Sequence, residues 1–542
     1  MLGLMQDMPL TTTMLFRRGE QYWGDRTVAT RTATGIERTS FADLAVHVRR
    51  LAGALDGLGL SADARVGSLG WNTGRHLGLY FAVPGSGRIL HTINIRYFPD
   101  QITYSVNHAE DEAVFVDRSL LPLFRRLIPH LDTVRHIIVM DDGASAEMPD
   151  DPRIIDYDDL VAGSDEVDFS DRISDENQAA ALCYTTGTTG NPKGVLYSHR
   201  STWLHANAGL GSYGARVTDR DNVLPVVPMF HAMAWGMPYT AWAAGARITM
   251  PGPDLSPAGL VSLIESERVT YAAGVPTIWM GMLPLLADHD VSSLDRVMCG
   301  GSAVPKALSE GWRDAIGVPI TQGWGMTETS PVASMSTLRA EHEDASEAEQ
   351  ADVRATQGMA LAGIELRIAD AETGEVLPWD DKATGEVQAR GPWVARQYYR
   401  TDSPGEQFTA DGWLRTGDVA AVSPQGYLRL VDRTKDLIKS GGEWISSVDV
   451  ENEIMSHPKV AEAAVIALPH PKWMERPFAC VVTKPGETMT RDEVLDYLRE
   501  RLSGFQVPDD VAFVEEIPKT SVGKFSKKTL RDRFADHPLP TV

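Results

Sequence analysis

Hydroxyl groups, glycines and one lysine are concentrated between Tyr184 and Arg200, in the sequence YTTGTTGNPKGVLYSHR. Glycine permits backbone conformations with positive φ and lets a ligand approach main-chain N–H groups, while threonines and a lysine add donors and positive charge. Such a loop suits a polyphosphate. It is not a Walker A loop, because the second glycine of that pattern would fall on Pro192. A flexible surface linker is the plainer alternative, but the hydrophobic runs on both sides favour a functional loop between buried strands.

Four further stretches carry polar residues that a fold alone does not require. They are TQGWGMTETS at 321–330, RTGD at 415–418, DRTKDLIKSGGEWIS at 432–446 and PKTSVGK at 518–524. Trp324 lies between two glycines, so its ring is free to lie flat against a ligand. Each stretch alone is a weak signal, since a TGD sequence is commonly just a turn and a lysine near a C-terminus is nearly always solvated.

All five stretches together, in this order, resemble the AMP-forming adenylating enzymes: acyl-CoA synthetases, luciferases and adenylation domains. The resemblance runs from about residue 41 to residue 528. It is closest to the medium- and long-chain fatty acyl-CoA synthetases, through KDLIKSGGEWISS at 435–447 and VLPVVPMFHAMAW at 223–235. The sequence is also similar to the 3-methylthiopropionate–CoA ligases, in part through QGWGM at 322–326. The resemblance implies that a carboxylate is joined to the α-phosphate of ATP and then passed to the thiol of CoA.

The resemblance also implies a set of residues that bind ATP or AMP. Within it, Trp324 would stack on adenine, where most relatives carry tyrosine, and Asp418 would accept hydrogen bonds from the ribose. Glu328, together with Thr185, would hold Mg²⁺, which prefers carboxylate, phosphate and water oxygens. Lys524 would bridge the carboxylate and the α-phosphate as charge builds up. The implied nucleotide-binding residues are Thr185, Thr186, Gly187, Thr188, Thr189, Gly190, Lys193, Gly301, Ser302, Ala303, Gln322, Gly323, Trp324, Gly325, Thr327, Asp418 and Arg433.

For the second step, the resemblance implies that a small C-terminal domain rotates about a hinge at Asp432. The rotation would carry Lys524 away and bring Lys439, a further catalytic residue, to the same site. Glycines beside the narrow pantetheine arm of CoA make sense, because that arm must pass close to the backbone. The implied CoA-binding residues are Lys435, Gly441, Gly442, Glu443 and Trp444.

The acyl pocket is implied by position in the same family pattern. A lone histidine is more often structural, but the place of His231 directly after PMF at 228–230 favours a catalytic role near the carboxylate. Trp235 is either a gate to the tail tunnel or a core residue. An apolar, methionine-rich lining fits an aliphatic acid, since methionine adapts to varied shapes. The implied pocket residues are Met233, Trp235, Met237, Gly300 and Val304.

These stretches lead us to expect an AMP-forming fatty acid–CoA ligase of class EC 6.2.1 that uses ATP, Mg²⁺ and CoA on a medium- to long-chain aliphatic acid. A 3-methylthiopropionate–CoA ligase and an adenylation enzyme that loads a carrier protein are alternatives. From other classes, a non-catalytic nucleotide-binding protein or a luciferase-like oxygenase stays open. The presence of Lys524, Lys439 and Glu328 argues against a dead enzyme.

The elements that must position these residues follow from hydrophobic periodicity. Short apolar runs alternate with helical segments, which predicts an α/β fold with layered, largely parallel sheets. We expect a large N-terminal domain over residues 1–431, with a β-rich subdomain from about 360 to 431, and a small, mobile α+β domain over 432–542. Ser40 and Asp43 predict a helix start, and the acidic segment 339–354 predicts a solvated surface helix.

The composition limits the classes of partner that the protein is expected to bind. The 542 residues carry a net charge of −23, which disfavours non-specific binding to nucleic acid but leaves room for a local basic site. Three dispersed cysteines predict neither a disulfide framework nor a zinc site. The uncharged window 223–246 is long enough to span a bilayer, but its prolines favour a buried strand, loop and helix. We therefore expect a cytoplasmic protein with no transmembrane segment, and a homodimer is plausible from relatives.

Overall fold

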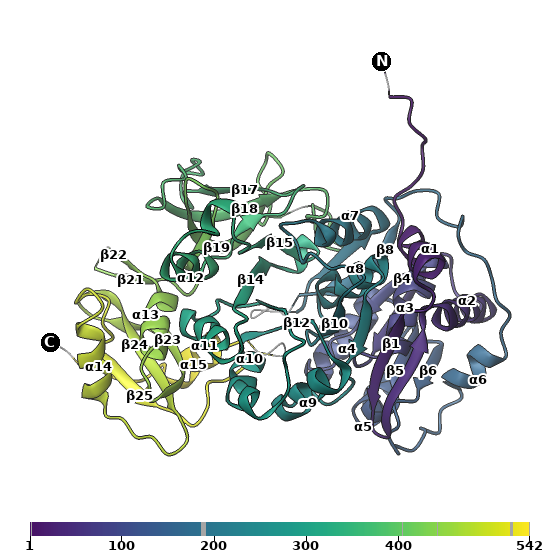
Figure 1. Cartoon of the computed structure of the whole chain (residues 1–542), viewed down its shortest axis with the longest axis horizontal. Coiled ribbons are helices and arrows are strands. Elements are labelled where there is room, and N and C mark those ends of the chain that lie inside the picture. The colour runs from purple at the N-terminus through teal and green to yellow at the C-terminus, as the bar shows by residue number, and fades with distance from the viewer. Residues whose placement is uncertain (2, 186–190, 404, 442, 521–523, 541–542) are drawn as a thin grey trace.

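The computed structural model describes residues 1, 3–185, 191–403, 405–441, 443–520 and 524–540. In this part of the chain the strands form four sheets (Figure 1). Two large sheets come first, a four-stranded sheet lies above them in the figure, and a five-stranded sheet forms a separate lobe at the C-terminal end. The predicted α/β fold, with a small C-terminal α+β unit, is confirmed.

The first large sheet has seven strands and is parallel except at one edge, where β8 and β9 run antiparallel. Because β8 leads directly into the predicted phosphate loop, this edge delivers Thr185 and Lys193 to the site. In spatial order the strands are β7 (Ile154–Asp156), β6 (His136–Met140), β5 (Asp111–Asp117), β3 (Arg65–Leu69), β4 (Ile89–Thr92), β8 (Ala179–Tyr184) and β9 (Gly194–Ser198).

The second large sheet has nine strands, and β14 near one end carries Trp324. Its central strands β10 to β14 pair in parallel, as the apolar runs predict, while β15 turns back antiparallel. In spatial order the strands are β16 (Met359–Ala360), β15 (Val332–Met335), β14 (Ile320–Gly325), β13 (Arg296–Gly300), β12 (Tyr271–Gly274), β10 (Asn222–Pro225), β11 (Arg247–Met250), β1 (Thr27–Thr32) and β2 (Gly35–Ser40).

Helices pack on both large sheets and share a core. Trp242 is fully buried, stacks on Phe41 with ring centroids 4.0 Å apart, and donates from Nε1 to the carbonyl of Phe16 over 2.9 Å. Ser40 caps α2 as predicted, accepting from the backbone N–H of Asp43. The helices are α1 (Thr12–Trp23), α2 (Phe41–Gly57), α3 (Gly74–Gly85), α4 (Pro99–Ala109), α5 (Leu121–Phe124), α6 (Tyr157–Ala162), α7 (His199–Leu210), α8 (Met237–Ala244), α9 (Pro257–Glu267), α10 (Pro276–Met282), α11 (Lys306–Ile316) and α12 (Glu347–Arg354).

The window 223–246 folds as the prolines predict. It contains most of β10, a short helical turn at Ala232–Gly236 and helix α8, and its residues are buried almost throughout. Across the described ranges, no helix is both long and apolar enough to cross a membrane.

The four-stranded sheet consists of β17 (Glu365–Ala369), β18 (Thr384–Arg390), β19 (Leu414–Val422) and β20 (Leu428–Arg433). The interpretation of RTGD as a turn is wrong, because these residues lie inside β19. Gly417 has a φ of +71°, and the pairing with β18 shifts register across residues 416–418, so the strand is irregular where Asp418 projects. The predicted domain boundary at Asp432 lies within β20 and stays a prediction.

The C-terminal lobe is a five-stranded sheet with helices α13 (Ser447–Met455), α14 (Arg491–Arg499) and α15 (Lys527–Arg533). Ser446 caps α13 by accepting from the backbone N–H of Asp449, and Thr490 caps α14 by accepting from that of Glu493. A short hairpin of β21 and β22 was not predicted. The strands are β21 (Ile438–Ser440), β22 (Glu443–Ile445), β23 (Val460–His470), β24 (Met474–Thr483) and β25 (Asp510–Phe513).

Candidate active site

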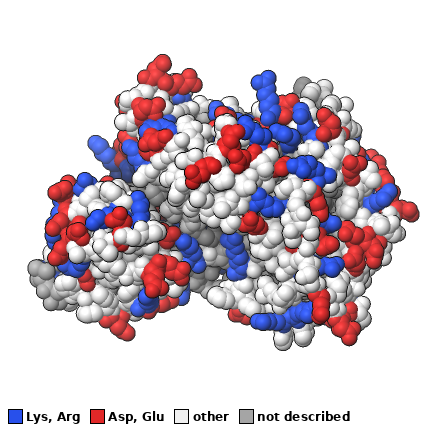
Figure 2. Space-filling model, turned by 60° about the horizontal axis from the view of Figure 1, so that its bottom comes forward, with Lys and Arg blue, Asp and Glu red and all other residues white. Residues whose placement is uncertain are grey.

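A cavity of about 790 Å³ lies where the four sheets approach one another. Figure 2 shows a hollow between the C-terminal lobe on the left and the rest of the molecule, with Lys and Arg side chains along it. Among the residues predicted from sequence, those that line the cavity are Thr185, Lys193, His231, Trp235, Gly300, Gly301, Ser302, Ala303, Gly323, Trp324, Gly325, Thr327, Glu328, Asp418, Asp432, Arg433, Lys435 and Lys524. Thr186, Gly187, Thr188, Thr189, Gly190 and Gly442 lie outside the described residues.

The end of the cavity where the nucleoside is predicted to bind is organised around Asp418. Its Oδ2 accepts a 2.9 Å hydrogen bond from Nε1 of Trp324, and its Oδ1 lies 3.2 Å from Nε of Arg433. Three strands, β14, β19 and β20, therefore meet at one carboxylate. A carboxylate has about four lone pairs, so Asp418 keeps acceptor capacity for ribose hydroxyls while it holds the indole edge in place.

The side chain of Gln322, one of the implied nucleotide-binding residues, is directed into the protein and does not line the cavity. This side chain is buried, donates to the carbonyl of Arg354 and accepts from Val304 N and from Gln357 Nε2, with distances of 3.1 to 3.2 Å. These bonds direct the amide into the protein and fix the chain at Val304. A nucleotide contact by Gln322 stays a prediction and would use its backbone, while Val304 is packed in the core.

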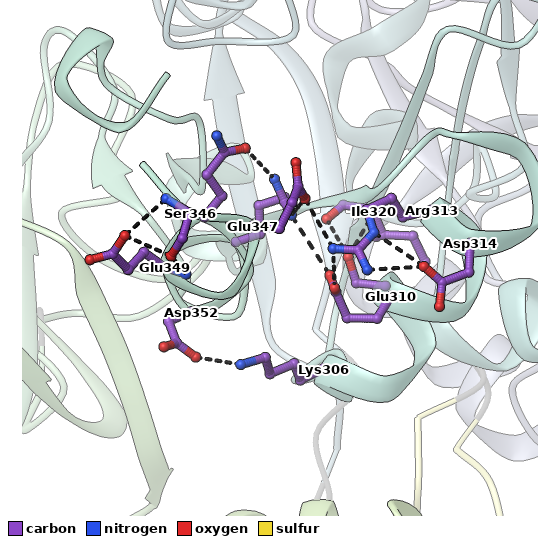
Figure 3. A network of polar contacts seen from close by, with 12 residues as sticks. Lys306, Glu310, Arg313, Asp314, Ile320, Ser346, Glu347, Glu349 and Asp352 are labelled. Atoms are coloured by element: carbon purple, nitrogen blue, oxygen red, sulfur yellow. Dashed lines mark hydrogen bonds and ion pairs between the residues drawn. The ribbon is translucent and has the colours of Figure 1, made fainter. Parts of the chain in front are cut away.

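An ion-pair network on helices α11 and α12 supports the strand that carries Trp324 (Figure 3). Arg313 pairs with Glu310 and Glu347, and Lys306 reaches Asp352 on α12. Ser309 on α11 accepts from the backbone N–H of Ile320, where β14 begins. The acidic segment 339–354 is therefore only partly a solvated surface helix, since Arg354 is buried with 7% of its surface exposed.

The phosphate end combines one residue set from each large sheet. Thr185 and Lys193 are tied by a backbone hydrogen bond of 2.9 Å, and Thr185 Oγ1 accepts from Lys193 N. Glu328 is buried opposite them, and burial raises the pKa of its carboxyl above the ordinary value. One carboxylate plus a threonine hydroxyl is a hard-oxygen donor set that fits Mg²⁺ sharing the phosphates of a nucleotide. No cluster of three or more His, Cys, Asp or Glu side chains suited to a metal occurs among the described residues.

Lys524 reaches this cavity from the C-terminal lobe. A Cβ added to Gly301 would lie 3.1 Å from Cε of Lys524, so the lysine passes directly over a glycine whose φ is +90°. Loss of solvent in the cavity lowers the pKa of Lys524 to about 8, with a smaller effect from the charge of Arg433. An incoming anion would oppose both effects, because it favours the protonated ammonium group.

Of the predicted CoA-binding residues, Lys435 lines the cavity, whereas Gly441, Glu443 and Trp444 lie elsewhere on the same lobe. Lys439 is on the β21–β22 hairpin, with Nζ 5.1 Å from the ring centroid of Trp444, and none of the described hairpin residues lines the cavity. A Cβ added to Gly441 would lie 2.7 Å from the ring of Trp473, which packs over it. In this structure Lys524 is thus in the cavity and Lys439 is outside it.

The acyl side is shaped by an unusual backbone turn. Residues 232–235 all have φ between +43° and +57°, and Gly236 follows at +72°. Left-handed conformations cost roughly 1–2 kcal/mol per non-glycine residue, so the surrounding packing must enforce this turn. It places His231 in the cavity, where desolvation lowers the pKa of its imidazole to about 3 and keeps the ring neutral.

Trp235 separates the main cavity from a second one of about 20 Å³. The indole lies against Gly300, where an added Cβ would be 3.1 Å from its ring. Met237, Met298 and Met335 line the second cavity, whereas Met233 is packed in the core. Of the predicted pocket residues, Trp235 and Gly300 therefore lie at the main cavity and Met237 lies behind them.

Two family models match the chain over most of its length. The model described as AMP-binding enzyme matches residues 15–399, and the one described as AMP-binding enzyme C-terminal domain matches residues 449–524.

The chain belongs to the AMP-binding enzyme family.

Similar proteins agree with this assignment and with the predicted resemblance. The long-chain-fatty-acid–CoA ligase of Thermus thermophilus is 44% identical, with 98% of this chain and 97% of that protein covered. The 3-methylmercaptopropionyl-CoA ligase of Ruegeria lacuscaerulensis is 42% identical, with 99% of each covered. The crystal structure of the anthranilate CoA ligase AuaEII in complex with anthranoyl-AMP has a TM-score of 0.85 at 25% identity, covering 98% of this chain and 99% of that one.

Sequence reasoning missed several residues of this AMP-binding enzyme site. Tyr398 lines the cavity and donates to Glu328, but it lies in the stretch VARQYYR, which contains no glycine and no carboxylate. In the sequence, nothing distinguishes Ser447 from an ordinary serine at the start of a helix. Its hydrogen bonds to Asp432, 15 residues away, are visible only once the lobe is in place.

The left-handed turn predicts that replacing Gly236 by alanine lowers the stability of the fold. An alanine Cβ there would lie 2.5 Å from Nδ1 of His205, in addition to the strain of a positive φ. Gly317→Ala is the matched control, because its φ is +77° and nothing lies within 4 Å of the added Cβ. We expect Gly236→Ala to cost about 1–3 kcal/mol more than Gly317→Ala, seen as a larger fall in thermal unfolding temperature. Equal falls would contradict the contact with His205.

Proposed function

We propose that this chain is an ATP-dependent, AMP-forming acyl-CoA synthetase that activates a medium- to long-chain aliphatic carboxylic acid and transfers the acyl group to CoA. One observation carries the proposal: Lys524 of the C-terminal lobe lies in the same cavity as Trp324, Asp418, Glu328 and Thr185. That arrangement gathers an adenine platform, a ribose acceptor and charges for phosphate in one place. The CoA ligases that are similar to this chain in sequence, reported above, support the proposal.

In the first half-reaction, Trp324 would stack on adenine and Asp418 would accept from the ribose. Lys193 would neutralise the terminal phosphates, and Glu328 with Thr185 would hold Mg²⁺, whose charge offsets that of the phosphate oxygens. The ammonium group of Lys524 would lie between the substrate carboxylate and the α-phosphate, where negative charge develops. Neutral His231 can hydrogen-bond near the carboxylate without adding a competing charge.

In the second half-reaction, the lobe would rotate at Asp432 so that Lys439 and Gly441 replace Lys524. The present orientation is held by a buried contact at the hinge. Oδ2 of Asp432 accepts from N of Ser447 over 2.7 Å and also from its hydroxyl, and Lys527 reaches the same hydroxyl while pairing with Glu451 over 2.8 Å. Rotation at Asp432 would have to break this contact, so it favours the adenylate-forming orientation.

A short acid such as 3-methylthiopropionate is the second candidate. The space behind Trp235 is only about 20 Å³, too small for a long tail unless the indole moves. A short chain would fit in front of Trp235 with no such movement. A carrier protein, in place of CoA, is an alternative acceptor of the acyl group. Homodimer formation and a cytoplasmic location stay predictions from sequence.

The direct test is a panel of carboxylic acids incubated with the purified chain, ATP, Mg²⁺ and CoA. Release of AMP and the mass of the thioester would identify both the reaction and the acid. Thioester formation with fatty acids supports the first candidate, and formation with only short acids supports the second. Absence of pyrophosphate release with every acid would overturn the proposal.

Lys524→Ala should separate the two half-reactions. We expect acyl-adenylate formation to fall by about 10²–10³, the usual effect of removing one preorganised donor. Thioester formation from supplied acyl-adenylate should stay largely intact, because Lys524 is expected outside the site in that step. Equal loss in both assays would contradict the two-orientation account.

Ser447→Ala should weaken the hinge contact without touching the cavity. Because a buried hydrogen bond to a charged group is lost, we expect pyrophosphate release to fall about tenfold relative to thioester formation from supplied acyl-adenylate. Thr490→Ala is the control, since it removes a hydroxyl at the start of another helix of the C-terminal lobe, α14. The same ratio in both variants would show that Ser447 acts only on stability.

Trp235→Ala tests the gate. Removing the indole would join the main cavity to the space lined by Met237, Met298 and Met335. We therefore expect the preference among acids of roughly 4 to 16 carbons to shift toward longer chains, measured as kcat/KM for each acid. If the profile keeps its shape and only the overall rate falls, Trp235 is a core residue and not a gate.

A further inference from the structure

The segment that joins β18 to β19 contacts both halves of the phosphate end of the cavity. The contacts of this segment are made by residues 394–400. Its Ala395 N donates to the carbonyl of Glu328 over 2.7 Å, and its Tyr399 N donates to the carbonyl of Gly194 over 2.8 Å. One chain segment from the four-stranded sheet thus ties together elements of the seven-stranded and nine-stranded sheets.

The side chain of Tyr398 lies between the two charged groups that face the phosphates. Its hydroxyl donates to Oε1 of Glu328 over 2.6 Å, and Nζ of Lys193 lies 4.6 Å from the centroid of its ring. Tyr398 and Glu328 are both buried, with 7% and 5% of their surfaces exposed, and Tyr398 contributes to the cavity wall, whereas Lys193 is exposed. The hydrogen bond between Tyr398 and Glu328 is therefore made away from bulk water, where a charge-assisted hydrogen bond is stronger than at the surface.

This placement solves an electrostatic problem. A lysine and a glutamate on the wall of the same cavity attract each other and could form a direct ion pair. Neither charge would then be available to a ligand. The aromatic ring gives the ammonium group of Lys193 a favourable place that leaves its N–H donors for phosphate oxygens. The hydroxyl on Oε1 fixes the rotation of the Glu328 carboxylate and leaves lone pairs on the second oxygen for a cation.

We propose that Tyr398 is a positioning residue that holds Lys193 and Glu328 apart and so prepares the site for a nucleotide triphosphate with its divalent cation. This role rests on the proposed function. It concerns the β- and γ-phosphates only, because the AMP portion is held by Trp324, Asp418 and Arg433 at the other end of the cavity. Tyr398 acts through its two neighbours and takes no part in the bonds that change.

The test is a set of equilibrium binding measurements by calorimetry with AMP, with ATP plus a chelator, and with ATP plus Mg²⁺. Tyr398→Phe keeps the ring beneath Lys193 but removes the hydroxyl. We expect its affinity for AMP to stay within about twofold of the wild type, while the tightening of ATP binding by Mg²⁺ falls about tenfold. In steady state, KM for MgATP should rise and thioester formation from supplied acyl-adenylate should not change.

Two further variants distinguish a positioning role of Tyr398 from a purely structural one. Tyr398→Leu also removes the ring, so ATP binding should weaken several-fold even without Mg²⁺. Tyr399→Phe is the matched control, since the neighbouring ring faces His108 and has no contact with Glu328 among those the structure describes. It should behave like the wild type with all three ligands.

Two results would overturn the inference. If Tyr398→Phe binds MgATP as the wild type does, or loses AMP affinity by the same factor, Tyr398 has no positioning role. If the wild-type chain binds neither AMP nor ATP, the proposed function fails and this role fails with it. The wild-type titration therefore distinguishes the two failures.

Discussion

The carboxylate of Asp418 is the contact on which the arrangement of the site depends. Trp324 donates to one oxygen, and Arg433 lies beside the other. These partners stand on strands β14 and β20, of which the first lines the cavity and the second leads into the C-terminal lobe. A shift of Asp418 would therefore change the adenine platform and the path of the chain into the lobe together. A buried carboxylate needs such partners, because an unpaired charge away from water is costly.

Around that contact, the four sheets each contribute a different charge or surface. The chain as a whole carries a net charge of −23, yet Lys193, Arg433 and Lys524 are brought to one hollow. Each cation is balanced locally by a neighbour: Tyr398 beneath Lys193, Asp418 beside Arg433, and Glu328 and Asp418 near Lys524. The acidic exterior disfavours non-specific anion binding, while the hollow can still accept one.

Much of the fold could be predicted because local chemistry agrees with it. Ser40 caps its helix, the run 65–69 is a strand, and the phosphate loop follows a buried strand, as periodicity and capping rules indicate. The site was predicted from five motifs in order, which carry residue types but not directions. The burial of Gln322, the irregular strand around Gly417 and the role of Tyr398 depend on partners distant in sequence, and no local pattern encodes them. The β21–β22 hairpin was too short to give a periodic signal.

The left-handed turn at 232–236 also limits how this scaffold can diversify. Side chains branched at Cβ are strongly disfavoured at five successive positive-φ positions, so the wall of the cavity near Trp235 cannot be reshaped freely from the turn. Substitutions that change the shape of the smaller cavity behind Trp235 are less constrained at Met298, Met335 and Leu361, which line it and have no positive φ. Homologues that act on different acids should therefore differ more at those three positions than along the turn.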